Sequence, residues 1–468
     1  MKKYFLVLLF IAVEWAVNAQ DLTTLRYDTD LLPASFHLSR REEVRKQMPD
    51  NSIAVIFSAP VRNRSNDDDY QYHQSPGFYY LTGCTEPNSM LVITKDKKVV
   101  EGEINNEFLF VQSRNPAAES WTGRRLGIEG AKKLLGFSTV FISGGLDTTK
   151  IDFRIYDKIL ILPYPQGIVA DKFNSDDLSK LISNFKQKTE GRESITDDFL
   201  LDKILDGLRE VKQPEEMKLQ RKAIDISADA HVEMMKSTNP GMHEYEVQAV
   251  GEYVFKKNGS EYVGYPSICG GGENTCILHY ESNRRPLKNG DLILLDMGAE
   301  YHGYSADVTR TIPVNGKFSA EQKLIYELVL QAQDSGIAKC LKGNSFSAPH
   351  QAAKAVLTDG LIKLGIIKSE SEVRKYFMHG TSHYLGLDVH DAGTYTSLKP
   401  GNVITVEPGI YIPEGSDCDK KWWNIGVRIE DDILITDSGY EILSAKAPRT
   451  VADIEKTMAQ KSSVFIQK

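Results

Sequence analysis

The sequence predicts two domains, the first of them an α/β layer, and three observations support this prediction. The chain has 468 residues, which is more than a single hydrophobic core usually serves. Hydrophobic residues make up 41% of it and charged residues 26%, as in ordinary globular domains. From about residue 35 to 185, short apolar runs alternate with polar segments, which is typical of strands alternating with helices.

The strand candidates of this first region share three properties. Each is four or five residues long, rich in β-branched or aromatic side chains, and bounded by turn or helix-like segments. Beyond single polar residues, the region carries no pattern that indicates chemistry. The candidates are residues 53–57, 78–81, 90–94, 108–112, 140–143 and 159–162.

A second region follows a polar segment without periodicity, at 191–198, which is predicted to link the two domains. Residues 214–216 (Pro-Glu-Glu) then predict a helix start, because proline fits a first turn and acids favour the positive end of the helix dipole. This helix is expected to reach Lys236 and to end at 239–241 (Asn-Pro-Gly). The glycine triplet 270–272 is interpreted as a loop beside a site, since no Gly-Lys-Ser/Thr follows it.

Charge and the first residues bear on partners and location. The net charge of −8 leaves no basic excess to neutralise phosphates, which argues against nucleic acid. Residues 1–19 have the pattern of an export signal, with Lys2 and Lys3 before an apolar stretch and small residues at its end. An uncleaved anchor or a buried first helix is the alternative, disfavoured because the apolar run is short. The processed chain is therefore expected to be periplasmic or extracellular, without a membrane anchor.

The five cysteines are scattered and lack the spacing of a zinc cluster or a disulfide framework. Export would permit a disulfide, and Cys269 and Cys276 flank the glycine triplet closely enough for one. Free or buried thiols are the favoured interpretation, and the pairing stays open.

Two aspartates are predicted to face each other across a hairpin. Residues 291–297 and 304–312 are strand candidates, and 301–303 can turn the chain between them. With that turn Asp296 lies opposite Asp307, at a Cβ separation of about 4.5–5.5 Å. Carboxylates this close repel each other unless a cation lies between them. The hairpin therefore indicates a metal site. The alternative, one solvated and one turn aspartate, is disfavoured by the apolar run around Asp296.

Three of the ten histidines, His379, His383 and His390, fall within twelve residues. A lone histidine usually has a structural role, but three between glycines favour a site, because neutral imidazole is the commonest metal ligand. Further on, Glu407 directly follows a mostly apolar run at 403–406, which places a ligand or base at the end of a buried strand.

Alternation in residues 426–430 places Arg428 and Glu430 on the same strand face. Arg428 could lower the cost of gathering carboxylates, whereas a surface ion pair between Arg428 and Glu430 is the alternative. Asp431 and Asp432 are expected to be solvated neighbours of the site. The preceding insert, 413–424, carries Trp422 and Trp423, which form either a substrate rim or, as favoured, a packed loop foot.

The five candidate ligands comprise four carboxylates and one imidazole. Zinc alone usually takes four ligands rich in nitrogen and sulfur. An oxygen-rich set suits a pair of divalent, manganese-like cations and two-metal hydrolysis. The candidates are Asp296, Asp307, His383, Glu407 and Glu430.

The order and spacing of these residues resemble the pita-bread metallopeptidases, a family that includes methionine aminopeptidase, prolidase and aminopeptidase P. HGTSHYLGLDVHD (379–391), EPGIYIP (407–413) and GVRIEDD (426–432) most resemble aminopeptidase P, and 70–83 resembles its N-terminal domain. The resemblance implies an α/β N-terminal domain followed by an α+β pita-bread catalytic domain. The implied division is a signal peptide at 1–19, an N-terminal domain at 20–200 and a catalytic domain at 201–468.

The resemblance also implies how the ligands divide the work. Asp296 would hold one ion through both oxygens, and Asp307 and Glu430 would bridge two ions. His383 and Glu407 would complete the shell of the second ion. Glu407 would in addition act as the base for a water between the ions.

The remaining positions matched by the resemblance surround the substrate. His279 and His390 would contact it and stabilise the tetrahedral intermediate, and His379 would also belong to the substrate-binding residues. Tyr411 and Arg428 match catalytic positions behind the ligands. The implied cofactor is two divalent ions, with manganese expected, and the implied assembly is a homo-oligomer.

The activity expected from this resemblance is hydrolysis of the N-terminal Xaa-Pro bond of peptides with proline at the second position. The close alternative is prolidase, which shares the five ligands and cleaves only Xaa-Pro dipeptides. A non-catalytic peptide-binding protein on the same scaffold is a third possibility, disfavoured because the ligand set is complete.

Overall fold

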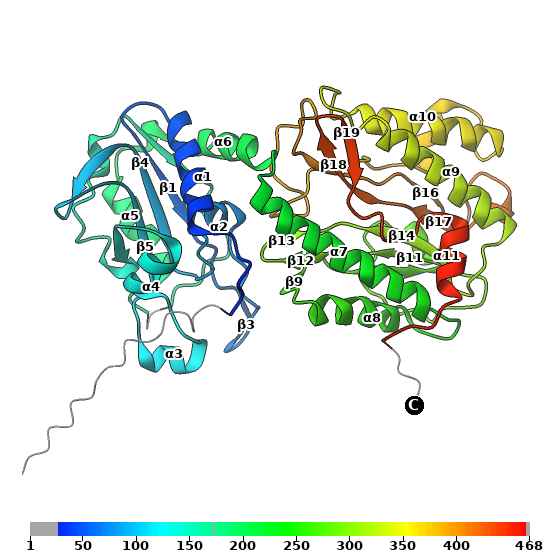
Figure 1. Ribbon diagram of the computed structural model, residues 1–468, viewed down its shortest axis with the longest axis horizontal. Helices are drawn as coiled ribbons and strands as arrows, with labels where there is room; N and C mark the ends of the chain where they lie inside the picture. Colours follow the sequence, from blue (N-terminus) through cyan, green and yellow to red (C-terminus); the bar gives the residue numbers. More distant parts are fainter. Residues whose placement is uncertain (1–26, 172–173, 465–468) are drawn as a thin grey trace, which may run out of the picture.

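The computed structural model describes residues 27–171 and 174–464 (Figure 1). The predicted export signal, 1–19, lies outside these residues. No helix within the described ranges has both the length and the apolar character that a membrane crossing needs. Two bodies lie side by side, and helix α6 (Leu200–Arg209) leads from the first to the second (Figure 1).

The first body is built on a six-stranded mixed sheet in the order β6-β5-β4-β1-β7-β8. β4 runs antiparallel to β1 and β5, while β6, β7 and β8 each run parallel to a neighbour. Five of the six strand candidates are confirmed. The strands are β1 (Ser52–Phe57), β4 (Met90–Val100), β5 (Glu103–Val111), β6 (Val140–Ile142), β7 (Lys158–Ile161) and β8 (Thr196–Asp197).

Alternation along the strands gives this sheet two buried faces. Ile53 and Val55 of β1 join a core that includes helix α5 (Leu178–Lys188). Ala54 and Ile56 face the opposite core, to which helix α1 (Ala34–Gln47) contributes. Smaller elements are β2 (Asn63–Ser65), β3 (Asp68–Asp69), α3 (Pro116–Thr122) and α4 (Gly127–Leu135).

Two predictions for this body are wrong. Residues 78–81 belong to helix α2 (Pro76–Thr82), which begins at a proline and ends at Gly83 with a φ of 67°. A continuous apolar run that is buried on all sides shows no hydrophobic periodicity, so periodicity cannot distinguish a strand from a helix. The flanking residues then carry the signal for the type of secondary structure. The supposed linker contributes β8, which pairs with β7 and completes the sheet.

In the second body, small sheets lie between helices α7 and α8 on one side and α9 and α10 on the other (Figure 1). The predicted helix start at Pro214 is confirmed, and the helix ends at Ser237. An α/β domain followed by an α+β domain is therefore observed. The helices are α7 (Pro214–Ser237), α8 (Glu244–Lys257), α9 (Ala320–Ile337), α10 (Ala348–Lys363) and α11 (Val451–Met458).

The strands of this body form three three-stranded sheets and one pair, β10-β11-β14, β13-β12-β9, β15-β18-β19 and β16-β17. The first sheet and the β16-β17 pair surround the candidate site. The strands are β9 (Tyr262–Val263), β10 (Ile268–Gly271), β11 (Leu292–Asp296), β12 (Ala299–Tyr301), β13 (Tyr304–Ser305), β14 (Thr309–Pro313), β15 (Val403–Val406), β16 (Gly409–Ile412), β17 (Ile425–Arg428), β18 (Asp431–Thr436) and β19 (Gly439–Ile442).

The predicted hairpin is more complex than a single turn. β12 and β13 close a short hairpin of their own, while β11 pairs with β14 so that Asp296 faces Thr309. Asp307 lies between β13 and β14, outside the ladder. The prediction of an Asp296–Asp307 cross-strand pair is therefore wrong in register. The glycine triplet is also no simple loop, because its first two residues belong to β10.

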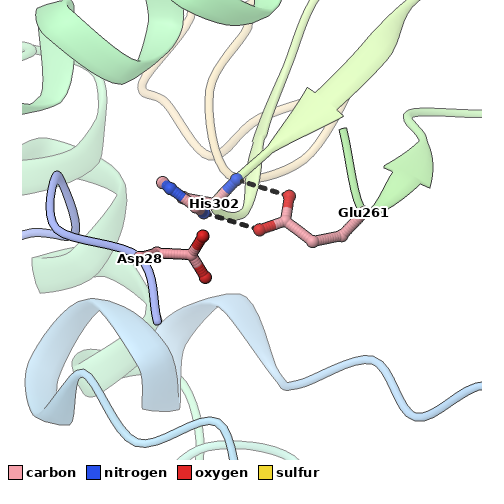
Figure 2. Close-up of side chains that lie close together, drawn as sticks. All are labelled: Asp28, Glu261 and His302. Carbon is pink, nitrogen blue, oxygen red and sulfur yellow. Dashed lines mark hydrogen bonds and ion pairs between the residues drawn. The ribbon is translucent and has the colours of Figure 1, made fainter. Parts of the chain in front are cut away.

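The two bodies meet around a cavity of about 340 Å³ whose lining comes from both of them. His73 Nε2 of the first body lies 2.9 Å from a carboxylate oxygen of Glu300 in the second. Nearby, His302 Nδ1 lies 2.5 Å from Glu261 and its Nε2 lies 3.0 Å from Asp30. Figure 2 shows Glu261 and Asp28 around the His302 side chain.

Candidate active site

A cavity of about 410 Å³ in the second body contains all five predicted ligands among its lining residues. Four further predicted residues, His279, His379, His390 and Arg428, also line it. Tyr411 is completely buried and reaches the site through hydrogen bonds to Arg428 and His379. The ligands that the sequence predicted are Asp296, Asp307, His383, Glu407 and Glu430.

The two aspartates approach each other despite the different register. Asp296 is the last residue of β11, and Asp307 comes just before β14, so both emerge at the same end of that sheet. The Tyr265 hydroxyl lies 2.5 Å from Asp296 Oδ1 and 2.6 Å from Asp307 Oδ1. Its single proton can serve only one of these oxygens at a time, so the pair keeps excess negative charge.

His383 and Glu407 are brought together by pairing between their backbones. Thr405 N–H donates to the His383 carbonyl at 3.0 Å, and Glu407 N–H donates to the Thr381 carbonyl at 2.9 Å. His383 Nδ1 lies 3.0 Å from the Tyr384 carbonyl, which places the proton on Nδ1 and leaves Nε2 as the ligand atom. That Nε2 lies 3.3 Å from Asp307 Oδ2 and 3.9 Å from Glu407 Oε1.

Glu430 lies just beyond β17 and is held by β14. The Thr309 hydroxyl donates to Glu430 Oε2 at 2.6 Å, and Glu430 N–H donates to the Thr309 carbonyl at 3.1 Å. Arg428 is buried and pairs with Asp296. The alternative of a surface ion pair between Arg428 and Glu430 is therefore wrong.

Burial and mutual repulsion shift the acidity of these carboxyl groups. Burial first, then the neighbouring carboxylates, raise the pKa of Asp307 and of Glu430 well above the ordinary values. Burial and the charge of Glu430 raise the pKa of Glu407 to about 8. Burial would also raise the pKa of Asp296, but Arg428 and the Tyr265 hydroxyl hold it below the usual range.

These properties fit a divalent metal centre. Ligand atoms of Asp307, His383 and Glu430 lie within 4.8 Å of one another. In the described part of the chain, Arg428 is the one lining side chain with a permanent positive charge, against four buried or nearly buried acidic ligands. A donor set of carboxylate oxygens and one imidazole suits hard or borderline divalent ions.

A hydrogen-bonded chain lies beside the ligands. Arg428 Nη1 donates to the Tyr411 hydroxyl at 2.9 Å, and that hydroxyl lies 2.8 Å from His379 Nε2. Burial and the charge of Arg428 lower the pKa of His379 to about 4, so this imidazole stays neutral. His390 is exposed at the mouth, with its ring 4.3 Å from the His383 ring. His279 is exposed in the same cavity.

Sequence reasoning missed several residues of the site. Tyr265 is one of them, because its contact with both aspartates depends on folding across residues that are distant in sequence. Glu281 and the apolar side chains of Ile268, Leu278 and Val389 also line the cavity. No local pattern separates these residues from ordinary loop and core positions.

The expectation that Asp431 and Asp432 are solvated is wrong. Both are completely buried. Asp431 pairs with Arg310 at 2.7 Å, and Asp432 Oδ2 accepts from Asp307 N–H at 3.3 Å. They therefore support the backbone of the site.

The insert 413–424 and the cysteines agree with the favoured interpretations. Trp422 is buried in the core and Trp423 packs partly against it, as expected for a loop foot. Trp423 Nε1 also donates to the Ser416 carbonyl at 3.1 Å. Cys269 and Cys276 carry free thiols.

Comparisons with known proteins agree with this geometry. A model described as metallopeptidase family M24 matches residues 218–437, and one described as the aminopeptidase P N-terminal domain matches residues 37–151. The chain is 38% identical to Xaa-Pro aminopeptidase of Haemophilus influenzae, over 91% of this chain and 98% of that protein. It is 37% identical to the Escherichia coli Xaa-Pro aminopeptidase, over 90% and 96%.

Solved structures show the same likeness in three dimensions. Pseudomonas aeruginosa aminopeptidase PepP matches with a TM-score of 0.83 and 36% identity, over 92% of this chain and 99% of that one. A variant of Escherichia coli aminopeptidase P in complex with substrate matches with a TM-score of 0.81 and 35% identity, over 92% and 98%. These matches confirm the predicted fold class, an α/β N-terminal domain followed by an α+β pita-bread catalytic domain.

Proposed function

Because this chain belongs to metallopeptidase family M24 and carries an aminopeptidase P N-terminal domain, we propose that it is a metal-dependent Xaa-Pro aminopeptidase. It removes the first residue of peptides whose second residue is proline. The observation that carries the proposal is the complete set of four acidic ligands and one histidine around one cavity. Similarity to Xaa-Pro aminopeptidases along nine-tenths of the chain does not favour the prolidase alternative.

Two divalent ions would be held by Asp296, Asp307, His383, Glu407 and Glu430. Bound divalent ions supply a lowered water pKa and Lewis acidity toward the scissile carbonyl. The protein holds the ligand carboxylates in fixed orientations through Tyr265, Thr309 and Arg428. Such outer contacts preserve ligand geometry in metal sites generally.

Glu407 is the candidate proton carrier. Its carboxyl group lines the cavity beside the other candidate ligands, where a positioned carboxylate can accept a proton and release it again. It would take a proton from the attacking water and pass it to the leaving nitrogen of proline. Its position at the end of β15, fixed by hydrogen bonding to Thr381, keeps that proton at one place.

The histidines and Arg428 shape the surroundings of the substrate. His279 and His390 are exposed in the cavity and can donate to a carbonyl oxygen as it gains charge. His379, kept neutral and oriented by Tyr411, offers a further imidazole surface. Such a site suits proline at the second position. The proline nitrogen of the scissile bond carries no N–H, so a hydrogen-bond acceptor placed to bind that N–H would have no donor.

We further propose manganese as the resident ion, a homo-oligomeric assembly, and export to the periplasm or the extracellular space. The oxygen-rich donor set supports manganese. Trp121 on α3 is 90% exposed and is a candidate contact residue of this assembly, since large aromatic side chains are enriched in subunit contacts. The pattern of residues 1–19 supports export.

Two peptides test the activity. Manganese-loaded protein is incubated with Arg-Pro-Pro and separately with Ala-Pro, and the products are identified by mass. Release of arginine from the tripeptide is expected. Cleavage of Ala-Pro alone would indicate a prolidase, and cleavage of neither with metal bound would contradict the assigned substrate.

A further inference from the structure

The loop that carries His390, residues 384–391, closes on itself. Asp391 N–H donates to the Tyr384 carbonyl at 2.9 Å, and Gly386 N–H donates to the Asp388 carbonyl at 3.1 Å. Ser305 N–H ties the loop to the β12-β13 hairpin through the Gly386 carbonyl at 2.7 Å. The loop therefore places the exposed ring of His390 at the mouth of the catalytic cavity.

Two cations from the junction between the two bodies hold this loop from behind. Arg209, the last residue of α6, contacts Asp391 and lies 2.8 Å from Asp388 Oδ2. Lys212 Nζ lies 2.8 Å from Asp391 Oδ2 and donates to the Arg209 carbonyl at 2.6 Å. Both oxygens of Asp391 are thus occupied by side chains that come from outside the loop.

This network is buried and charge-balanced. The exposed fractions of the Asp391 and Lys212 side chains are 1%, and that of Arg209 is 8%. A Cβ at position 386 would lie 2.1 Å from Asp391 Oδ2, so glycine is required for the carboxylate to sit under the loop. Buried charges in such a network are strongly coupled to their partners, because each loses water that only the partner replaces.

We propose that Asp391, held by Arg209 and Lys212, is a positioning residue that sets the place of His390. The inference rests on the proposed aminopeptidase function, in which His390 contacts the substrate. It assigns a catalytic consequence to the segment that joins the two bodies, since α6 and the start of α7 contribute no side chain to the cavity lining. A misplacement of about 1 Å at a reacting centre can lower the rate by about 100-fold.

The test is a double-mutant cycle between Asp391→Asn and His390→Ala. Asp391→Asn keeps the side-chain shape and should lower kcat/KM about 10- to 100-fold. In the His390→Ala background the same change should have little further effect, because the group it positions is gone. Equal effects in both backgrounds would overturn the proposal. If Asp391→Asn does not fold, Asp388→Asn is the milder variant, because Asp388 is a half-exposed ion-pair partner of Arg209.

Hydrogen–deuterium exchange gives a readout that does not depend on activity. The peptide containing residues 384–391 should exchange faster in Asp391→Asn, and unchanged exchange would contradict the proposal. If the wild-type protein cleaves no Xaa-Pro peptide, the proposed function fails while this measurement still tests the positioning. Glu107→Gln, which breaks the buried pair with Arg41 in the first body, is the matched control and should lower Tm without changing kcat/KM.

Discussion

The catalytic cavity and the junction between the two bodies each bring one histidine and two carboxylates within ligand distance. The groups are Asp307, His383 and Glu430 in the cavity, and Asp28, Glu261 and His302 at the junction (Figure 2). At the junction, His302 has a carboxylate on each ring nitrogen, from Glu261 and from Asp30. These partners raise its pKa against the opposing effect of burial, which favours the protonated imidazole and offsets part of the carboxylate charge there.

The cavity has no such balance. Its buried carboxyl groups repel one another, and the pKa values of Asp307, Glu407 and Glu430 are all raised. This difference in charge environment shows that the proximity of side chains able to bind a metal does not by itself identify a metal centre. Excess buried negative charge is a stronger indication, because bound cations or protons must relieve it.

The largest contrast is expected for activity. Glu407→Gln should lower kcat by about 100- to 10,000-fold, because the amide cannot carry the proton. The measurement is the steady-state release of arginine from Arg-Pro-Pro. Glu261→Gln is the matched control at the junction and should leave kcat unchanged. An equal loss in both variants would mean that the two regions do not differ in the way proposed.

Metal response provides the second contrast. After chelation, addition of manganese should raise the melting temperature, with a stabilisation of about 4 kcal/mol per site when free metal exceeds Kd about 1,000-fold. Elemental analysis should find two ions per chain. Asp307→Asn should abolish the thermal response, whereas His302→Asn should retain both the response and the stoichiometry. Loss of one ion in His302→Asn would make the junction a metal site.

The contrast between the regions also explains what could be predicted from the sequence. The five candidate ligands lie in short segments whose apolar surroundings and histidine spacing are visible in the sequence, and the structure brings all five to one cavity. The junction network is not visible in the sequence, because Asp30, Glu261 and His302 are brought together only by folding. The contact between Tyr265 and both aspartates escaped prediction for the same reason.

Three predictions were wrong, each for a different physical reason. Residues 78–81 were assigned to a strand although Pro76 and Gly83 carried the signals for a helix start and end. The register of Asp296 and Asp307 was wrong because one turn was assumed where the chain forms two separate ladders. Burial of Asp431 depends on Arg310, which is more than a hundred residues away. Such a pairing leaves no trace in local periodicity.

A smaller effect is expected when the junction network is broken. His302 has a φ of 50°, which asparagine tolerates, so His302→Asn should keep the turn while removing both ion pairs. The loss should be about 1–2 kcal/mol, since the Glu261 and Asp30 side chains are 34% and 55% exposed and solvent screens them. Thermal unfolding should show a Tm lower by a few degrees, with kcat/KM unchanged.

The smallest expected effect is the pH dependence of the Tm difference between the wild-type protein and His302→Asn. The folded state raises the pKa of His302, so its stabilising contribution is complete below the unfolded value of about 6.5. The contribution is lost as the pH rises through the folded pKa, where the imidazole loses its proton. The Tm difference between wild type and His302→Asn should therefore be largest below about pH 6.5 and shrink as the pH rises above it. A difference that grew with pH would mean that neutral His302 is the stabilising form, and the two regions would then share an excess of negative charge.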